Sequence, residues 1–211
     1  MTHMPNDNAF DSGLDQPSRQ ALRKTLRQQR RGLSYEEQAQ ASERLALNLL
    51  KLPEMHRSRH IGVYLANDGE IDPALYIDLG RRKGLNFYLP VLHPVYPGKL
   101  VFSPYREGAL LTANRFGIPE PAFSEARRRP AWALDAVLFP LVGFDEMGGR
   151  LGMGGGFYDR TFAFSRLRPG MAPKLIGLAH DFQCVERLPT EPWDVPLHGV
   201  VTDRRCYRFR S

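Results

Sequence analysis

Cysteine is scarce in this sequence: Cys184 and Cys206 are the only two among 211 residues. The chain has no Cys-x-x-Cys motif and no cluster of histidine and cysteine at zinc-binding spacing. The sequence therefore indicates neither a disulfide framework nor a structural zinc site. Such cysteine usage is typical of a reducing compartment, so we expect a cytoplasmic protein.

Long apolar runs are missing as well. No stretch reaches the roughly 18 consecutive apolar residues that a membrane-spanning helix requires. The N-terminal residues also lack the basic and apolar regions of a signal peptide. We therefore expect no membrane partner and no export.

The composition is that of a folded globular protein, with 42% hydrophobic and 25% charged residues. Residues 1–17 are polar, contain Pro5, Gly13 and Pro17, and show no periodicity, so we expect a disordered or loosely attached leader. Residues 18–211 are short enough to form one domain. The net charge of +6 favours anionic partners, either a nucleic acid or small anions.

Short apolar stretches alternate with helical patterns along this domain. Strands are expected at residues 60–65, 86–91, 101–105, 136–142, 175–179, 200–202 and 207–209. Helices are expected from Ser18 to Gly32, from the capping box at Ser34 to Pro53, from Asp72 to Gly84, and over residues 161–167, with a solvated linker at 127–130. This order predicts an α/β fold with an open, largely parallel sheet, helices on both faces and a single domain.

One stretch is rich in glycine: Arg150-Leu151-Gly152-Met153-Gly154-Gly155-Gly156-Phe157-Tyr158-Asp159-Arg160. A glycine-rich turn between a strand and a helix gathers backbone N–H groups at one concave point, which suits a phosphate. Arg150 and Arg160 could meet phosphate oxygens, and Asp159 offers the oxygen ligand that Mg²⁺ prefers. The alternative is a flexible turn in which glycine only permits positive φ. The stretch is neither a Walker A loop nor a Gly-x-Gly-x-x-Gly motif.

This string resembles the signature of the 5-formyltetrahydrofolate cyclo-ligases, also called methenyltetrahydrofolate synthetases. Three further stretches agree with that family in order and spacing, at residues 19–34, 64–72 and 191–197. The resemblance covers roughly residues 18–203. It implies conversion of 5-formyltetrahydrofolate, with or without a polyglutamate tail, to 5,10-methenyltetrahydrofolate, while ATP becomes ADP and phosphate. It also implies Mg²⁺ as cofactor, and we expect a monomer.

The resemblance implies an ATP site on two segments. On the first helix it comprises Arg19, Gln20, Ala21, Leu22 and Arg23, and on the glycine loop it comprises Arg150, Leu151, Gly152, Met153, Gly154, Gly155, Gly156, Phe157 and Tyr158. Taken without the resemblance, Arg19, Arg23, Arg27 and Arg30 would be a solvated basic face.

The resemblance also implies positions for the folate, for catalysis and for the metal. The metal ligands that it implies are Asp159 and Asp194, and the catalytic positions are Arg150 and Glu70. The positions that it implies for folate binding are Leu65, Glu70, Phe116, Met153, Gly154, Gly155, Gly156 and Phe157. Each has an ordinary alternative, since Glu70 lies near a helix start and Phe116 on a loop. Asp159 could cap a helix, and Asp194 could be a turn residue.

Two other classes of function remain open at this point. A basic nucleic-acid-binding protein could use the arginine-rich first helix, although the sequence lacks an aromatic and basic RNA-binding motif. A relative of the sugar-phosphate isomerases would fit the strand pattern, but a fold does not assign chemistry. The sequence shows no convincing Ser-His-Asp or Cys-His arrangement for nucleophilic catalysis. We expect the cyclo-ligase function and no nucleic-acid partner.

Overall fold

The computed structural model describes residues 18–114, 117–121 and 128–209. The expected leader at 1–17 and the candidate folate residue Phe116 lie outside the described residues. Within them, no helix has both the length and the apolar character that crossing a membrane requires.

The α-helices of the described residues are α1 Arg19–Arg31, α2 Tyr35–Lys51, α3 Pro53–His56, α4 Ala74–Arg82 and α5 Phe157–Phe162. The first two begin at the caps that the sequence predicts. The Ser18 side chain accepts a hydrogen bond from Ala21 N at the start of α1, and Gly32 ends that helix. The predicted capping box of Ser34 and Glu37 is present at the start of α2.

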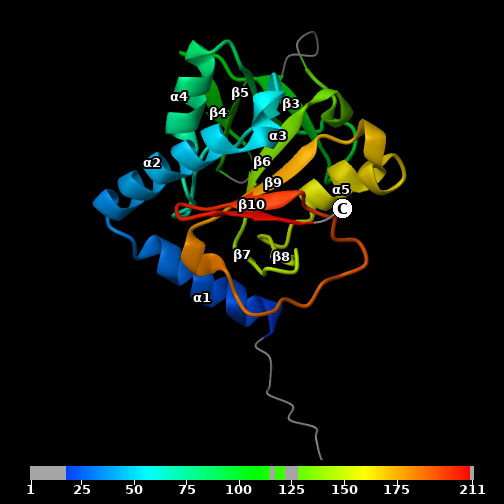
Figure 1. Ribbon diagram of the computed structural model, residues 1–211. Helices are drawn as coiled ribbons and strands as arrows, with labels where there is room; N and C mark the ends of the chain where they lie inside the picture. The colour runs from blue at the N-terminus through cyan, green and yellow to red at the C-terminus, as the bar shows by residue number, and fades with distance from the viewer. Residues whose placement is uncertain (1–17, 115–116, 122–127, 210–211) are drawn as a thin grey trace, which may run out of the picture.

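Strands form one seven-stranded sheet and two small hairpins (Figure 1). Their bounds are β1 His60–Gly62, β2 Asn86–Leu92, β3 Leu100–Pro104, β4 Leu111–Ala113, β5 Pro119–Pro121, β6 Ala136–Pro140, β7 Gly143–Phe144, β8 Arg150–Leu151, β9 Lys174–Leu178, β10 Gly199–Val201 and β11 Cys206–Arg208. The large sheet has the order β11-β10-β9-β6-β1-β2-β3. Its five central strands are parallel, and only the edge strands β11 and β3 run antiparallel to their neighbours. The predicted largely parallel α/β sheet is confirmed.

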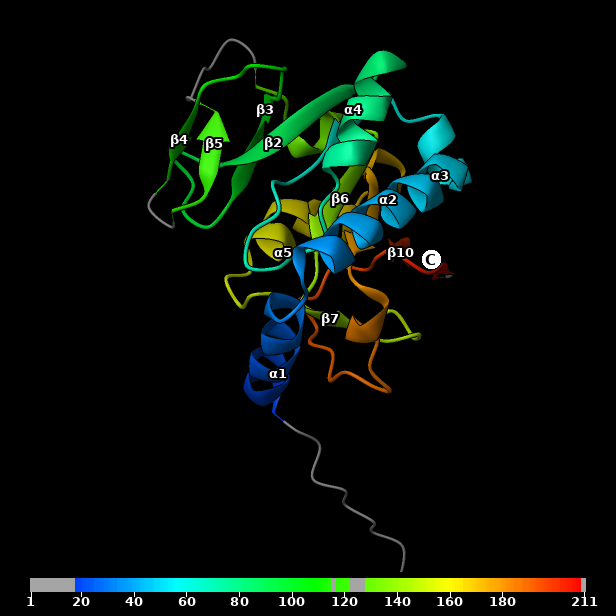
Figure 2. The same cartoon turned by 90° about the vertical axis from the view of Figure 1, so that its left-hand side faces the viewer.

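Two layers of helix enclose the sheet. In Figure 2, α2 and α4 lie together on one side, and α5 lies on the other. Side chains of β6 alternate between the two cores: Ala136 and Leu138 pack with the α2 layer, whereas Val137 and Phe139 pack on the α5 side. The parallel strands are therefore buried on both faces, as a parallel sheet requires.

Some expected boundaries were wrong. Strand β1 ends at Gly62 rather than at residue 65, and the following residues run into a turn. Helix α5 begins at Phe157, four residues before the expected start, and a short 3-10 helix at Ala163–Arg166 follows it. Helix α4 begins at Ala74, although the Asp72 carboxylate still accepts a hydrogen bond from Ala74 N at 2.9 Å. In the expected solvated linker, Arg129 is half-buried and donates to Ala133 O at 2.8 Å.

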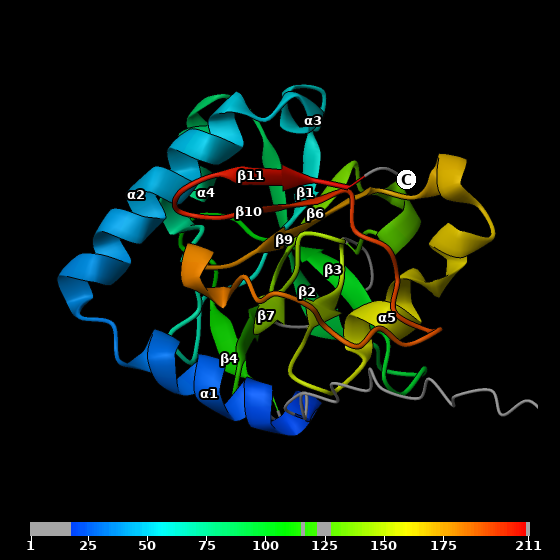
Figure 3. The same ribbon diagram turned by 60° about the horizontal axis from the view of Figure 1, so that its bottom comes forward.

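The strand order places a crevice beside β1. The chain passes from β1 to β2 on one side and later returns to β6 on the other side of β1. In an open α/β sheet, ligands bind outside the carboxyl ends of the strands at such a reversal. Helix α1 closes this region from below β7 (Figure 3), where Leu26 packs with Val142, Leu151 and Leu188.

Candidate functional site

A cavity of about 950 Å³ opens at this reversal. Its walls come from α1, the carboxyl ends of β1, β2 and β6, the β4–β5 hairpin, the glycine loop and the segment around residue 193. Pockets for small molecules commonly have about 300–1,000 Å³, so this one has room for a large ligand or for two smaller ones. Both arginines and carboxylates line it.

Arginines of α1 form one wall of the cavity. Arg19, Arg23, Arg27 and Arg31 all line it. Arg19 donates to Asp194 Oδ2 at 3.4 Å, whereas Arg27 donates to Asp68 Oδ2 at 2.7 Å. Since a helix rises 1.5 Å per residue, the twelve steps from Arg19 to Arg31 cover about 18 Å of this wall. The helix thus connects the end of the cavity at Asp194 with the end at the β1–α4 turn.

The glycine loop of residues 152–156 forms a second wall. Gly154 and Gly156 have φ of 92° and 62°, so the backbone there takes the left-handed conformation that favours glycine. Arg23 Nε donates to Gly152 O at 2.8 Å and ties this loop to α1. Arg160, a suggested phosphate contact, instead donates to Gly98 O and Gly155 O and supports the loop from behind.

Not all of the expected ATP-site residues reach the cavity. Gln20 and Ala21 are exposed on α1 and do not line it. Leu22 and Leu151 belong to the small apolar cluster beneath α1. Phe157 and Tyr158 do line the cavity, and the Tyr158 ring stacks on Phe139 with centroids 4.9 Å apart.

Two carboxylates and two guanidinium groups meet at the Asp194 end. Buried Arg150 contacts the carboxylate of Asp159 and the carbonyl of Val195. Val195 N also donates to Asp159 Oδ1 at 3.2 Å, which places Asp159 beside the 194–195 segment. Asp194 in turn accepts from Glu191 N at 2.9 Å and from Arg19.

This pair of carboxylates fits a magnesium ion that is shared with phosphate. The described residues hold no group of three or more His, Cys, Asp or Glu side chains that could hold a metal by itself. Mg²⁺ keeps several waters and commonly takes one or two carboxylates together with substrate phosphates. Asp159 and Asp194 are two carboxylates at this end that could contribute to such a donor set.

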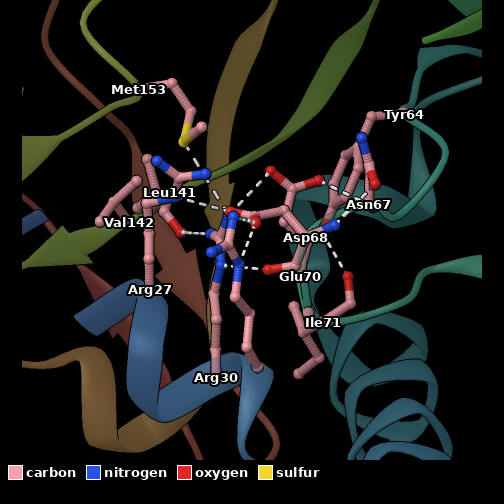
Figure 4. A network of polar contacts seen from close by, with 12 residues as sticks. Arg27, Arg30, Tyr64, Asn67, Asp68, Glu70, Ile71, Leu141, Val142 and Met153 are labelled. Carbon is pink, nitrogen blue, oxygen red and sulfur yellow. Dashed lines mark hydrogen bonds and ion pairs between the residues drawn. The ribbon is translucent and has the colours of Figure 1, made fainter. Parts of the chain in front are cut away.

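The β1–α4 turn, residues 66–70, forms the opposite end of the cavity (Figure 4). Leu65, Asn67, Asp68 and Glu70 line it. Glu70 Oε2 accepts from Asn67 N at 3.2 Å, and its Oε1 lies 3.5 Å from Arg30 Nη2. Burial raises the pKa of Glu70 to about 7, so the carboxyl is divided between its two protonation states near neutral pH.

The sequence interpretation missed the residues that hold this turn. Arg30 has no exposed side-chain surface, so it does not belong to a solvated basic face. Asp68 accepts hydrogen bonds from Arg27, Arg30 and Arg31. Burial alone would raise the pKa of Asp68, but these three bonds together lower it. The four-residue spacing of the arginines indicates that they share one face of the helix, but it does not indicate that Asp68 covers part of that face.

Glu70 makes the stability of the fold depend on pH. Its folded-state pKa of about 7 exceeds the ordinary value of 4.5, so between these pH values the folded state holds a proton that the unfolded chain releases. The free energy of unfolding therefore loses this contribution as pH rises through the window, by on the order of 1 to 3 kcal/mol. Glu70→Gln is expected to remove that loss. Urea unfolding of both proteins at pH 5 and pH 8 measures it; an equal pH difference in the two proteins would contradict the assignment.

Comparison with known proteins identifies the family of this chain. The model of the 5-formyltetrahydrofolate cyclo-ligase family matches residues 15–203. The chain is 40% identical over 187 residues to a 5-formyltetrahydrofolate cyclo-ligase of Escherichia coli strain K12, covering 87% of this chain and 100% of that protein. It is 39% identical to a cyclo-ligase of Haemophilus influenzae, covering 89% of this chain and 99% of that one.

Among solved structures, the fold is similar to the 5,10-methenyltetrahydrofolate synthetase of Aquifex aeolicus. The TM-score is 0.75 at 32% sequence identity, and the match covers 92% of this chain and 93% of that one. Family model, sequence and fold all agree over nearly the whole domain, and the chain belongs to the 5-formyltetrahydrofolate cyclo-ligase family, a family of ligases.

Proposed function

We propose that the protein cyclises 5-formyltetrahydrofolate to 5,10-methenyltetrahydrofolate with ATP, releasing ADP and phosphate. The main support is that one cavity is lined both by the glycine loop with its arginines and by the Leu65–Glu70 turn. The first wall suits the phosphates of ATP, and the second suits a flat heterocycle with N–H donors. A reaction between the two ligands needs both in one enclosed space.

The arginine end is assigned to the triphosphate. Arg19, Arg23 and Arg150 bring positive charge to the loop of residues 152–156. Burial lowers the pKa of Arg23, and the neighbouring charge of Arg19 lowers it further. An anion between the two guanidinium groups would relieve this repulsion, which supports a phosphate there.

The turn end is assigned to the folate. Glu70 can accept hydrogen bonds from the N–H groups of the pterin, while Leu65 and Phe157 offer apolar surface to its ring. The glycine loop contacts arginines of both ends, since Gly152 O accepts from Arg23 Nε at 2.8 Å and Met153 Sδ lies 3.9 Å from Arg30 Nη2, so the formyl group would meet the γ-phosphate beside this loop. This arrangement places the reacting atoms of two substrates beside one loop.

The proposed chemistry begins with attack of the formyl oxygen on the γ-phosphorus. The bond from that phosphorus to the bridging oxygen breaks, ADP leaves, and N5 carries an imidate phosphate. N10 then adds to the formyl carbon and loses its proton, and phosphate departs with the former formyl oxygen. Such a transfer mainly needs positioning and neutralisation of charge, which Arg150 and the α1 arginines supply. Mg²⁺, held by Asp159 and Asp194, would neutralise further charge on the phosphate oxygens.

An absorbance assay tests this function. Protein, ATP, Mg²⁺ and 5-formyltetrahydrofolate together are expected to produce the methenyl chromophore, with one ADP for each product. Omission of ATP serves as the control and should leave the absorbance unchanged. Product formation without nucleotide, or no product with it, would exclude the proposal.

Arg23→Ala is expected to raise the KM for ATP by about 10- to 100-fold, because a charge-assisted hydrogen bond is worth roughly 1.5 to 3 kcal/mol. Folding should change little, since Arg23 is only half-buried and lies on a helix surface. Steady-state kinetics with varied ATP measure the change, and Lys24→Ala, an exposed neighbour on α1, is the matched control. Unchanged ATP kinetics in Arg23→Ala would show that this side chain does not bind ATP.

The nucleic-acid alternative gains no support from the structure. Its basis was the basic face of α1, but Arg30 is buried, while Arg19 and Arg23 donate to groups at the cavity wall.

We also propose that the enzyme acts as a cytoplasmic monomer and accepts polyglutamylated folate. The two free cysteines fit a reducing compartment.

A further inference from the structure

Arg30 uses its whole guanidinium group inside the protein. Its Nε donates to Asp68 O at 2.8 Å, and Nη2 donates to Asp68 Oδ2 at 2.7 Å. Nη1 donates to Leu141 O at 3.3 Å, beyond the carboxyl end of β6. Nη2 also lies 3.5 Å from Glu70 Oε1, and Figure 4 shows all of these contacts converging on Arg30. A fork of five N–H donors suits this geometry, whereas a single ammonium group does not.

The turn that Arg30 holds has an unfavourable backbone. Asp68 has φ of 56°, and among the described residues it is the only one other than glycine with positive φ. This conformation costs roughly 1 to 2 kcal/mol for a residue with a side chain. Gly69 O accepts hydrogen bonds from Gln38 Nε2 at 3.1 Å and from His180 Nε2 at 3.2 Å. The turn therefore keeps its shape through contacts from α1, α2 and the segment after β9.

Several charged or titratable groups face the Glu70 carboxyl. Arg30 and Arg27 come from α1, Asp68 from the same turn, Tyr64 from the segment after β1, and Tyr158 from α5. The two cations favour the ionised carboxylate, whereas burial and the negative charge of Asp68 oppose it. Of the two cations, Arg30 lies in contact range of Glu70.

We propose that Arg30 is a positioning residue of the folate site, which holds the Glu70 carboxyl at the cavity wall and favours its ionised form. It does so by fixing the 66–70 turn against Leu141 O and by placing a positive charge beside the carboxylate. The inference rests on the proposed function, which assigns Glu70 to the pterin. Arg30 itself touches neither substrate in this assignment.

A titration of the free protein tests the link. With ¹³C-labelled glutamate carboxyls, the Glu70 signal is assigned by its loss in Glu70→Gln and followed against pH. Arg30→Met is expected to raise the Glu70 midpoint by about one pH unit or more, a tenfold change in proton affinity. Arg31→Met is the matched control, because Arg31 also contacts Asp68 but has no contact with Glu70 among its ion pairs. Its Glu70 midpoint should stay at the parental value.

The pH profile of kcat/KM for 5-formyltetrahydrofolate gives a second measurement. Its limb near neutral pH should move with the Glu70 midpoint in Arg30→Met and return toward the parental position in Arg30→Lys, which restores the charge. A folded Arg30→Met protein with an unmoved Glu70 midpoint would overturn the inference. If Arg30→Met does not fold, the kinetics of Arg30→Lys test the inference. The KM for the folate should then rise about tenfold while the KM for ATP stays unchanged. An unchanged KM for the folate would overturn the inference.

These outcomes are distinct from failure of the proposed function. If the Glu70 midpoint shifts but the protein has no activity on the folate, the proposed function is excluded and the coupling of Arg30 to Glu70 is still supported. An unmoved midpoint in a fully active parent and variant would remove only the role of Arg30.

Discussion

Asp159→Asn and Asp194→Asn are each expected to lower kcat by about 10²- to 10³-fold, the usual range for loss of one group that stabilises charge in a transition state. The amide keeps the size of the side chain but cannot neutralise a divalent cation. Affinity for Mg²⁺ should fall in both variants, so excess Mg²⁺ should restore part of the activity. Initial rates across a Mg²⁺ series measure both effects.

The stability of the two variants should differ, which helps to separate metal binding from structure. Asp159 is the partner of buried Arg150, so its loss also leaves an unbalanced charge inside the protein. Asp194 pairs with the half-exposed Arg19, so its replacement should cost less stability. Asp181→Asn is the control, since it loses a carboxylate–arginine contact with Arg205, and neither residue lines the cavity. If both site variants fold and keep the parental dependence on Mg²⁺, the metal assignment is wrong.

Gly69→Ala is expected to destabilise the protein by about 2 to 5 kcal/mol and to weaken folate binding more than ATP binding. A Cβ at this position would lie 2.6 Å from Arg30 O, and the residue has φ of 74°. The close atom belongs to the α1 backbone, which cannot move without shifting the arginine wall. Because Glu70 is the next residue, displacement of the turn should raise the KM for the folate.

Gly84→Ala is the matched control for the free-energy cost of placing alanine in a left-handed backbone conformation. Gly84 has φ of 76°, but a Cβ there would meet no heavy atom within 4 Å. Its replacement should cost only the roughly 1 to 2 kcal/mol of the left-handed conformation. Unfolding free energies and the KM values of both variants measure the difference. Equal costs in both variants would show that the contact between the turn and α1 does not constrain the site.

Local signals predicted the parts of the fold that depend on neighbours in sequence. The caps at Ser18 and Ser34 are correct because a cap is made within one helical turn. Within α2, Ala41, Leu45 and Leu49 are buried because their four-residue spacing places them on one face of the helix. The directions of β3 and β11 were not specified, yet their short connections to β2 and β10 favour antiparallel pairs.

The site was only partly predictable because its contacts are distant in sequence. The glycine loop and its resemblance identified one wall of the cavity, and Glu70 marked another. Arg30 was grouped with the solvated arginines because its acceptors lie 38 residues away at Asp68 and 111 residues away at Leu141. A helical periodicity shows which residues share a face, but not which distant group covers that face.

The closure of the cavity by α1 has a consequence for synthesis of the chain. Arg19 meets Asp194, 175 residues later in the sequence, and also Pro189 O. At about 5 to 20 residues per second, a ribosome needs roughly 9 to 35 s to make that stretch. Until Leu188 is made, the apolar surface of Leu26 lacks one of the residues that cover it in the folded protein. A nascent chain that stops before residue 189 therefore lacks Pro189 and Asp194, which close the arginine end of the cavity, and it also lacks strands β10 and β11 of the sheet.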